Sequence, residues 1–165
     1  MTRIGILSDT HLTEATESFR KQVARCFNGV EIILHAGDLT ERRVLDAFAG
    51  KEVHAVHGNM CNYSAYSTLP ETKTLRVGGF TIGLAHGAGG PAHNIEERLW
   101  NLLGPVDCIV FGHTHHAICH RTGPVLFINP GRFVCDSHYH MAGTYAILEV
   151  DRELRGAIHT IAGCE

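Results

Sequence analysis

The sequence lacks three features that would each place it in a definite class of protein. No apolar run reaches the roughly 20 residues that a membrane-spanning helix needs. The six cysteines include no Cys-x-x-Cys pair, which favours small core residues of a reducing compartment over a disulfide framework or a zinc knuckle. Basic residues are not in excess, since the formal net charge is −3, and this argues against a broad surface for duplex nucleic acid.

Internal repeats, low-complexity tracts and linkers are absent as well. The 165 residues are therefore expected to form one domain, residues 1–165, large enough to bury roughly 70% of the surface of the unfolded chain. The first apolar run begins at about Arg3, so we expect no signal peptide and a cytoplasmic protein without membrane attachment. Glycine and histidine, in contrast, are abundant, with 18 and 13 residues.

The first 60 residues alternate between strand patterns and helix patterns. One helix is expected over about 17–27, and Thr40 is suited to cap a second helix that ends at Gly50. Short apolar runs typical of buried strands lie at 4–7, 32–34 and 53–56. This β-α-β-α-β order predicts a mainly parallel sheet, in which ligands gather beyond the carboxyl ends of the strands.

The second half of the chain shows a hairpin, a helix and further strands. Residues 60–70 are expected to form a polar loop, and Gly78-Gly79 is a hairpin signal. A helix with Leu99 on its apolar side ends at Gly104-Pro105. Strands are expected at 72–77, 80–85, 109–111, 116–121, 125–128, 144–150 and from Leu154. Together the patterns predict an α/β fold of two packed sheets flanked by helices.

Side chains that can bind metals follow five of the expected strands. His113 and His115 alone could belong to an ordinary polar loop, although residues two apart in an extended segment point the same way. The pattern recurs, however: the strand ends supply Asp9 and His11, His35 and Asp38, His57 and Asn59, His86, and His113 and His115. Such repetition at one edge of a sheet predicts a metal centre.

These motifs resemble, in order and spacing, the calcineurin-like metallophosphoesterases, and most closely the small single-domain bacterial and archaeal phosphodiesterases of that superfamily. The resemblance spans Ile4 to about Val150 and implies a four-layer α/β/β/α sandwich of two mixed sheets. It is carried by Asp9-x-His11, Gly37-Asp38, Gly58-Asn59, His86-Gly87, Gly112-His113-x-His115 and the turn Asn129-Pro130-Gly131.

The resemblance also implies a site for two divalent metal ions. Asp38, Asn59 and His86 are the implied catalytic residues of a phosphodiesterase, in which a hydroxide between the cations attacks phosphorus in line. Nitrogen and oxygen ligands without thiolate suit Mn²⁺, the metal expected first, and also Fe²⁺, Co²⁺, Ni²⁺ and Zn²⁺. The implied ligands are Asp9, His11 and His115 for the first ion, Asn59, His86 and His113 for the second, and Asp38 as the bridge.

The chain departs from the family at the residue after Asn59. The wider family has a histidine there, held to protonate the leaving group, and the small bacterial group often has Cys-Asp. Met60-Cys61 matches neither pattern, so the usual general acid is missing. His57 or another nearby histidine is an alternative donor.

Several other polar residues have open alternatives. Arg132 either reaches a substrate phosphate or is an ordinary surface arginine. Asp136-x-His138-x-His140 has metal-like spacing, but we expect an exposed loop or a rim of the site there rather than a third metal. His35 and His57 lie beside expected ligands and either support them or are merely structural, which is the role we expect. His54, His93, His120 and His159 are expected to be surface or strand residues.

A scaffold is the alternative function. The same fold serves as a protein-binding module in the retromer subunit that resembles these enzymes but has lost part of the ligand set. The seven complete ligand positions favour the enzyme, with a small phosphoester as its partner. Nucleotide diesters, cyclic nucleotides and other small phosphoesters all fit the sequence, as do a monomer and a homo-oligomer.

Overall fold

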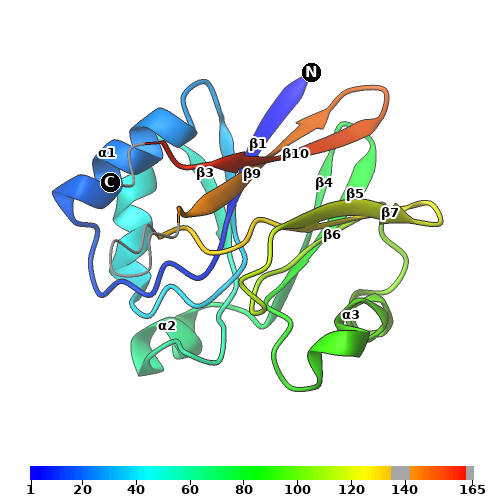
Figure 1. Ribbon diagram of the computed structural model, residues 1–165, viewed down its shortest axis with the longest axis horizontal. Coiled ribbons are helices and arrows are strands. Elements are labelled where there is room, and N and C mark those ends of the chain that lie inside the picture. The colour runs from blue at the N-terminus through cyan, green and yellow to red at the C-terminus, as the bar shows by residue number, and fades with distance from the viewer. Residues whose placement is uncertain (135–141, 163–165) are drawn as a thin grey trace.

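Two five-stranded sheets form the centre of the protein, and helices lie outside them (Figure 1). The computed structural model describes residues 1–134 and 142–162. The first half contains β1 (Thr2–Leu7), α1 (Glu17–Cys26), β2 (Ile32–His35), the 3₁₀ helix η1 (Arg42–Phe48), β3 (Glu52–Ala55), α2 (Tyr63–Thr68), β4 (Thr72–Val77) and β5 (Phe80–Ala85). The second half contains the 3₁₀ helix η2 (Ala92–Asn94), α3 (Ile95–Leu103), β6 (Cys108–Val110), β7 (Ile118–Thr122), β8 (Val125–Asn129), β9 (Thr144–Val150) and β10 (Leu154–Thr160).

Each sheet is mixed, with a parallel core of three strands. The first sheet has the order β10-β9-β1-β2-β3. In it β1, β2 and β3 are parallel, β9 is antiparallel to β1, and β10 is antiparallel to β9. The second has the order β4-β5-β6-β8-β7, in which β5, β6 and β8 are parallel. The predicted hairpin at Gly78-Gly79 is confirmed, because it joins β4 to β5.

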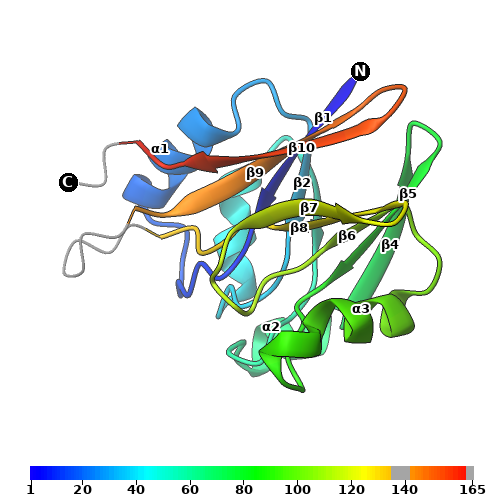
Figure 2. The same cartoon turned by 45° about the vertical axis from the view of Figure 1, so that its right-hand side comes forward.

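Three separate cores hold four layers together. The side chains of a strand alternate between its two faces, so Ile4 and Ile6 point between the sheets while Ile33 points towards α1 and η1. On the second sheet, Val110 faces the central core and Ile109 packs under α3. In both views α1 and α3 lie on opposite sides of the paired sheets (Figure 1, Figure 2). The expected α/β/β/α sandwich of two mixed sheets is confirmed.

Two local expectations were wrong. Thr40 does not cap a helix, because its φ of 65° is left-handed whereas a capping residue needs an extended backbone; the following residues form a 3₁₀ helix. Residues 60–70 are not all loop, because Asn62 caps the short helix α2 by accepting a hydrogen bond from the Ala65 N–H at 3.1 Å. A helix of six residues that buries only Ala65 leaves almost no apolar periodicity to detect.

A third correction concerns the strand expected from His116. It begins later, at Ile118, since the His116 N–H donates to Thr114 Oγ1 at 3.3 Å and so completes the turn after the His115 loop. Among the described residues, no helix has the length and apolar character needed to cross a membrane.

Candidate metal centre

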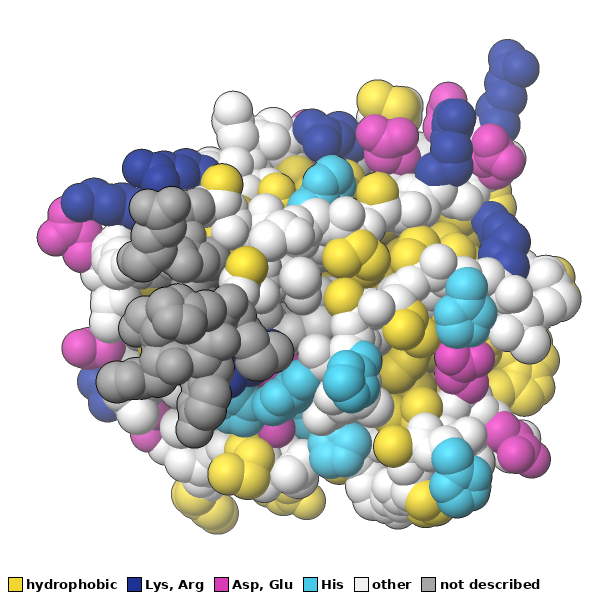
Figure 3. Space-filling view, in the orientation of Figure 1, with side chains coloured by type: hydrophobic (Ala, Val, Ile, Leu, Met, Phe, Trp, Pro, Cys, Tyr) yellow, Lys and Arg dark blue, Asp and Glu magenta, His cyan; other side chains and the backbone are white. Residues whose placement is uncertain are grey.

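The loops that follow β1, β2, β3, β5 and β6 carry all seven expected ligands to one region between the two sheets. β1, β2 and β3 run parallel in one sheet, and β5 and β6 run parallel in the other, so the carboxyl ends of each set lie along one edge. On the face of the molecule shown in Figure 3, histidine side chains gather in the lower central part, with acidic side chains visible between them. The side chains there form two connected groups.

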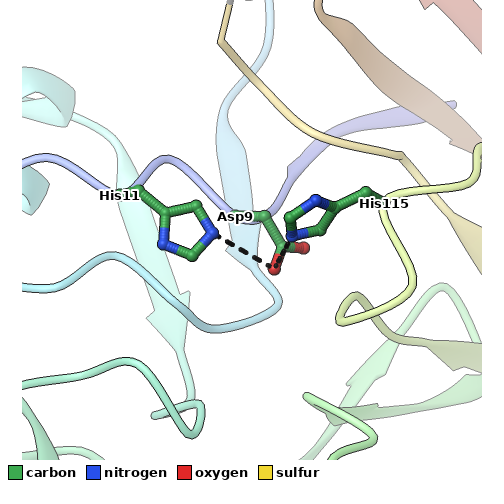
Figure 4. Close-up of side chains that lie close together, drawn as sticks. All are labelled: Asp9, His11 and His115. Carbon is green, nitrogen blue, oxygen red and sulfur yellow. Dashed lines mark ion pairs between the residues drawn. The ribbon is translucent and has the colours of Figure 1, made fainter.

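The first group centres on the carboxylate of Asp9. Its Oδ1 lies 3.2 Å from His115 Nε2 and 3.9 Å from His11 Nε2. Figure 4 shows the two imidazole rings approaching this oxygen from opposite sides. Asp9 Oδ1 and His11 Nε2 are buried and have no hydrogen-bond partner within the described ranges. Buried polar atoms that converge without partners are suited to a cation.

The second group centres on the amide oxygen of Asn59. Asn59 Oδ1 lies 3.2 Å from His86 Nε2 and 3.1 Å from His113 Nδ1. The ring of His86 stands edge-on to that of His113, with centroids 5.2 Å apart. One oxygen and two imidazole nitrogens again meet at one point, as a second cation would require.

Asp38 lies between the two groups. Its Oδ2 is 3.2 Å from His86 Nε2, and a potential ligand atom of Asp38 lies within 4.8 Å of ligand atoms of both Asp9 and His86. The Met60 backbone N–H donates to the other oxygen, Oδ1, at 2.7 Å, which fixes the plane of the carboxylate. This position suits a carboxylate that serves two cations.

The backbone at the site is strained. Six residues other than glycine have a positive φ in the described part of the chain, and five of them are expected ligands: Asp9, His11, Asp38, His113 and His115. Such conformations cost of order 1–3 kcal/mol each and persist where the surrounding structure fixes them. Two backbone hydrogen bonds do this, from the Asp9 N–H to Gly37 O and from the His11 N–H to Asp38 O, both 3.0 Å.

The glycines before the ligands provide room for them. A Cβ on Gly58 would collide with Asp38 Oδ1 and would come within 2.7 Å of the Asp38 backbone nitrogen. A Cβ on Gly112 would collide with Ser8 Oγ and lie 2.7 Å from Asp9 Oδ2. The Gly-Asn and Gly-His pairs therefore have a steric reason, since a larger residue would displace a carboxylate.

Three groups that hold the candidate ligands in place were not predicted from the sequence. Ser8 Oγ donates to Asp9 Oδ2 at 2.6 Å, which turns the other carboxylate oxygen towards the histidines. The Ala36 carbonyl lies 2.7 Å from His86 Nδ1, so a proton on Nδ1 leaves Nε2 free to face the site. Buried Asn129 donates to Gly112 O at 2.8 Å and thereby holds the His113 loop. The Asn-Pro-Gly turn was visible in the sequence, but not this contact.

The electrostatics favour the metal-binding forms of Asp38, His11 and His113, whereas His86 holds a proton more readily and would release it to a cation. Burial would raise the pKa of Asp38, but the hydrogen bond and charge of His86, with the Met60 N–H, outweigh it and hold that pKa below its usual value. Burial would lower the pKa of His86, but Asp38 and Asp9 raise it above its ordinary value. Burial lowers the pKa of His11 and of His113, so both rings are neutral and available to a cation at pH 7.

The residues with open alternatives are placed as follows. Arg132 is half-buried, and its charge lies close enough to lower the pKa of His11, which places it beside the site. His35 is fully buried and structural: its Nδ1 accepts from the Gly37 N–H at 3.3 Å and its Nε2 lies 3.2 Å from Thr10 Oγ1. The His57 ring packs on Tyr66. Asp136-x-His138-x-His140 lies outside the described residues.

The other histidines and cysteines take ordinary positions. His54 pairs with Glu52, His120 with Glu96, and His159 stacks on Tyr145. His93 is exposed. Four cysteines are free thiols in the described part of the chain, namely Cys26, Cys61, Cys108 and Cys119. Cys61 is turned inward, where its sulfur accepts from the Gly58 N–H at 3.3 Å.

Comparison with known proteins gives matches over most of the chain. The family model of the calcineurin-like phosphoesterase superfamily domain matches residues 2–153. A probable metallophosphoesterase of Methanothermobacter thermautotrophicus is 32% identical over 130 residues, which cover 78% of this chain and 75% of the relative. Phosphodiesterase MJ0936 of Methanocaldococcus jannaschii is 25% identical over 166 residues, with coverage of 92% and 95%.

A solved structure shows the same fold. The crystal structure of Vps29 from Entamoeba histolytica, complexed with Zn²⁺, has a TM-score of 0.71 with this chain at 22% identity. The superposition covers 97% of this chain and 99% of Vps29. The likeness therefore includes both sheets and the helices outside them.

Proposed function

The chain belongs to the calcineurin-like phosphoesterase superfamily, and from this premise we propose that it is a metal-dependent enzyme that hydrolyses small phosphodiesters. One observation carries the proposal: seven polar side chains from five strand ends converge, six of them in two groups and the seventh, Asp38, between the groups. The similarity to a named phosphodiesterase over 92% of the chain supports a diester as substrate.

We assign two divalent cations to the site. Asp9, His11 and His115 would hold one, Asn59, His86 and His113 would hold the other, and Asp38 would contact both. When bound, the cations would supply Lewis acidity and a nucleophile for in-line attack at phosphorus. Mn²⁺ is the proposed metal, and the Zn²⁺ bound by Vps29 makes zinc the first alternative.

The chain's own groups prepare the site before a substrate arrives. Ser8 and the His113 N–H, at 2.6 and 3.2 Å, hold Asp9 Oδ2 and leave Oδ1 for a ligand. Asp9 and Asp38 are the buried carboxylates of the described site, so two divalent cations would exceed their charge and attract a phosphate anion. Met60 offers no proton, so the leaving oxygen would take one from water.

Removal of metal tests the proposal. Protein treated with chelator should lose hydrolysis of bis(p-nitrophenyl) phosphate, and Mn²⁺ should restore it with two metal ions per chain by elemental analysis. His86→Ala should lose most of this activity, whereas His120→Ala, which changes a histidine paired with Glu96 outside the site, should keep it. Full activity in metal-free protein would contradict the proposal.

The same experiment separates the enzyme from a scaffold. A chain that binds two metals but cleaves no phosphomonoester or phosphodiester in a broad panel would be a scaffold with this fold. We also propose a cytoplasmic location and a small phosphoester as the partner, and sedimentation of the metal-loaded protein would distinguish a monomer from a homo-oligomer.

A further inference from the structure

A cavity of about 300 Å³ opens beside the candidate metal centre, and we propose that it binds a flat aromatic ester group of the substrate, such as the base of a nucleoside, with Tyr66 as the stacking residue. The inference rests on the proposed function and narrows its substrate class. Asn59 and His86, two of the proposed ligands, line the cavity. A phosphate held at the metal centre would therefore have an ester group within reach of it.

The walls of the cavity suit a flat apolar ring. On one side stands Tyr66 of α2, whose side chain is 57% exposed although it is a large aromatic residue. Its ring rests on that of His57, with centroids 4.2 Å apart and planes at 43°. On the other side lie Leu99, which is buried, and Leu102, which is 53% exposed. Apolar and aromatic walls with a few polar groups are the usual lining of a ligand site.

The wall that carries Tyr66 is held in place before any ligand binds. Asn62 caps α2 through its side chain, and its own N–H donates to Thr40 O at 2.9 Å. Ser64 Oγ donates to Glu41 at 2.9 Å, and Ala65 is fully buried. A fixed helix lowers the entropy lost when a ring stacks on Tyr66.

The opposite wall is fixed by Arg98. Its guanidinium donates to Asn94 Oδ1 at 3.1 Å and to the carbonyl of Gly87 at 3.0 Å, with longer bonds to Ala88 and Pro91 at 3.4 Å. Arg98 thus braces the turn between β5 and α3: it lines the cavity, but four of its five N–H donors are bonded to protein oxygens.

Charge and size restrict the ligand further. Glu71 adds a carboxylate to the lining, which would repel a second phosphate and would accept a hydrogen bond from a ring N–H or an amino group. A volume of about 300 Å³ lies at the small end of ligand sites, so it suits one nucleoside rather than an oligonucleotide. The cationic Arg98 also lines the cavity, but most of its donors are bonded to protein oxygens, so the small volume and Glu71 favour a heterocycle over a polyphosphate.

Calorimetric titration tests this assignment independently of turnover. Adenosine 5′-monophosphate and ribose 5-phosphate would be titrated into Mn²⁺-loaded protein, with chromatography afterwards to confirm that each probe is intact. Base stacking on an aromatic residue predicts that the adenosine compound binds about tenfold more tightly. Tyr66→Ala should abolish this difference and Tyr66→Phe should keep it. Tyr63→Ala is the matched control, since Tyr63 lies on the same helix, is 85% exposed and does not line the cavity.

Each outcome bears on a different claim. Equal affinities for the two probes in the unmodified protein would overturn the inference, and so would a preference for the adenosine compound that survives in Tyr66→Ala. A preference that depends on Tyr66 in a protein that cleaves no phosphoester would support the cavity assignment while rejecting the proposed enzymatic function.

Discussion

At the scale of single residues, Asp38 differs from the other proposed ligands because it lies within reach of both groups. One of its carboxylate oxygens accepts from the Met60 N–H at 2.7 Å, and the other lies 3.2 Å from His86 Nε2. His115, in contrast, contacts only the Asp9 side of the site and is 43% exposed. The two residues should therefore differ in how many metals depend on them.

We expect Asp38→Ala to lose metal at both positions and His115→Ala to weaken one. The reason is that Asp38 lies within reach of both groups, whereas His115 belongs to the Asp9 group alone. Elemental analysis after dialysis should give close to zero metals per chain for Asp38→Ala and about one for His115→Ala, with the lowest turnover in the former. An Asp38→Ala protein that holds two metals would remove Asp38 from the bridging position.

Met60 contributes its backbone to the site but no proton from its side chain, which is 59% exposed. We expect rates to fall steeply as the pKa of the leaving group rises, because general acid assistance of typically 10²–10⁴-fold is missing. Met60→His should flatten this dependence and help alkyl esters most. The measurement is kcat/KM for a series of aryl and alkyl esters; a shallow slope in the unmodified protein would reveal another donor, such as His57.

His35 makes the stability of the metal-free protein depend on pH. Burial lowers its pKa to about 3 from an ordinary value of 6.5. Below pH 6.5 the imidazole of His35 is therefore protonated in the unfolded chain but not in the folded protein. The free energy of unfolding is thus highest above pH 6.5, and it falls by about 1.4 kcal/mol per pH unit as the pH drops towards 3.

Replacement of His35 by Gln should remove this part of the pH dependence. Urea unfolding of both proteins at pH 7, 6 and 5 gives the slopes, and all other groups are common to the two chains. Parallel slopes would show that His35 titrates alike in the folded and unfolded states. The absolute stability of His35→Gln is expected to be lower at pH 7, because the contact with Thr10 changes.

At the scale of elements, the turns after the strands carry the function and the strands only present them. Gly58 illustrates the point, since its missing side chain leaves the space that Asp38 occupies. Gly123, in the turn between β7 and β8, has a φ of 59° with open space around it. Gly58 is therefore needed for the position of Asp38, whereas Gly123 is needed only for the conformation of its own turn.

Gly58→Ala and Gly123→Ala should therefore fail in different ways. Gly58→Ala should lose metal affinity and at least tenfold in turnover, because the new Cβ displaces the Asp38 carboxylate. Gly123→Ala should cost about 1–2 kcal/mol in the free energy of unfolding through its left-handed backbone, with metal binding unchanged. Metal titration and urea unfolding of both variants check this; normal metal affinity in Gly58→Ala would contradict it.

At the scale of the whole molecule, the candidate centre joins the two sheets. Asp9 and Asp38 follow strands of the first sheet, while His86, His113 and His115 follow strands of the second. A cation held by both sets would tie the halves of the sandwich together. We propose that residues 1–165 unfold as one domain for this reason and because the central core is shared.

Metal loading should therefore raise the melting temperature of the entire chain in a single transition. Free metal at about 1,000 times its Kd adds roughly 4 kcal/mol for one site, which corresponds to about 8–16 °C for a chain of this size. Calorimetry with and without Mn²⁺ measures the shift. Asp38→Ala should lose it and His120→Ala should keep it, whereas two separate transitions would argue against one domain.

The amino-acid sequence by itself determined most of the strands, the helices α1 and α3, and the candidate ligands. Apolar alternation and turn residues are local signals, so β4, β5 and β9 begin and end where the pattern predicts. The candidate ligands were visible because each follows a strand, and parallel strands bring their carboxyl ends to one edge. The left-handed Thr40 and the short helix α2 were missed because long-range contacts, such as Asn62 N–H to Thr40 O, decide them.

Only the tertiary structure decided how the ligands are oriented and what lies beside them. Ser8, the Ala36 carbonyl and Asn129 act on partners that are distant in sequence or set by side-chain rotation, which no local pattern encodes. The cavity at Tyr66 likewise needs α2 and α3 to face each other across about 30 residues of chain. The sequence shows which residue types follow each strand, but the distances between side chains from separate strands are set only when the two sheets pack together.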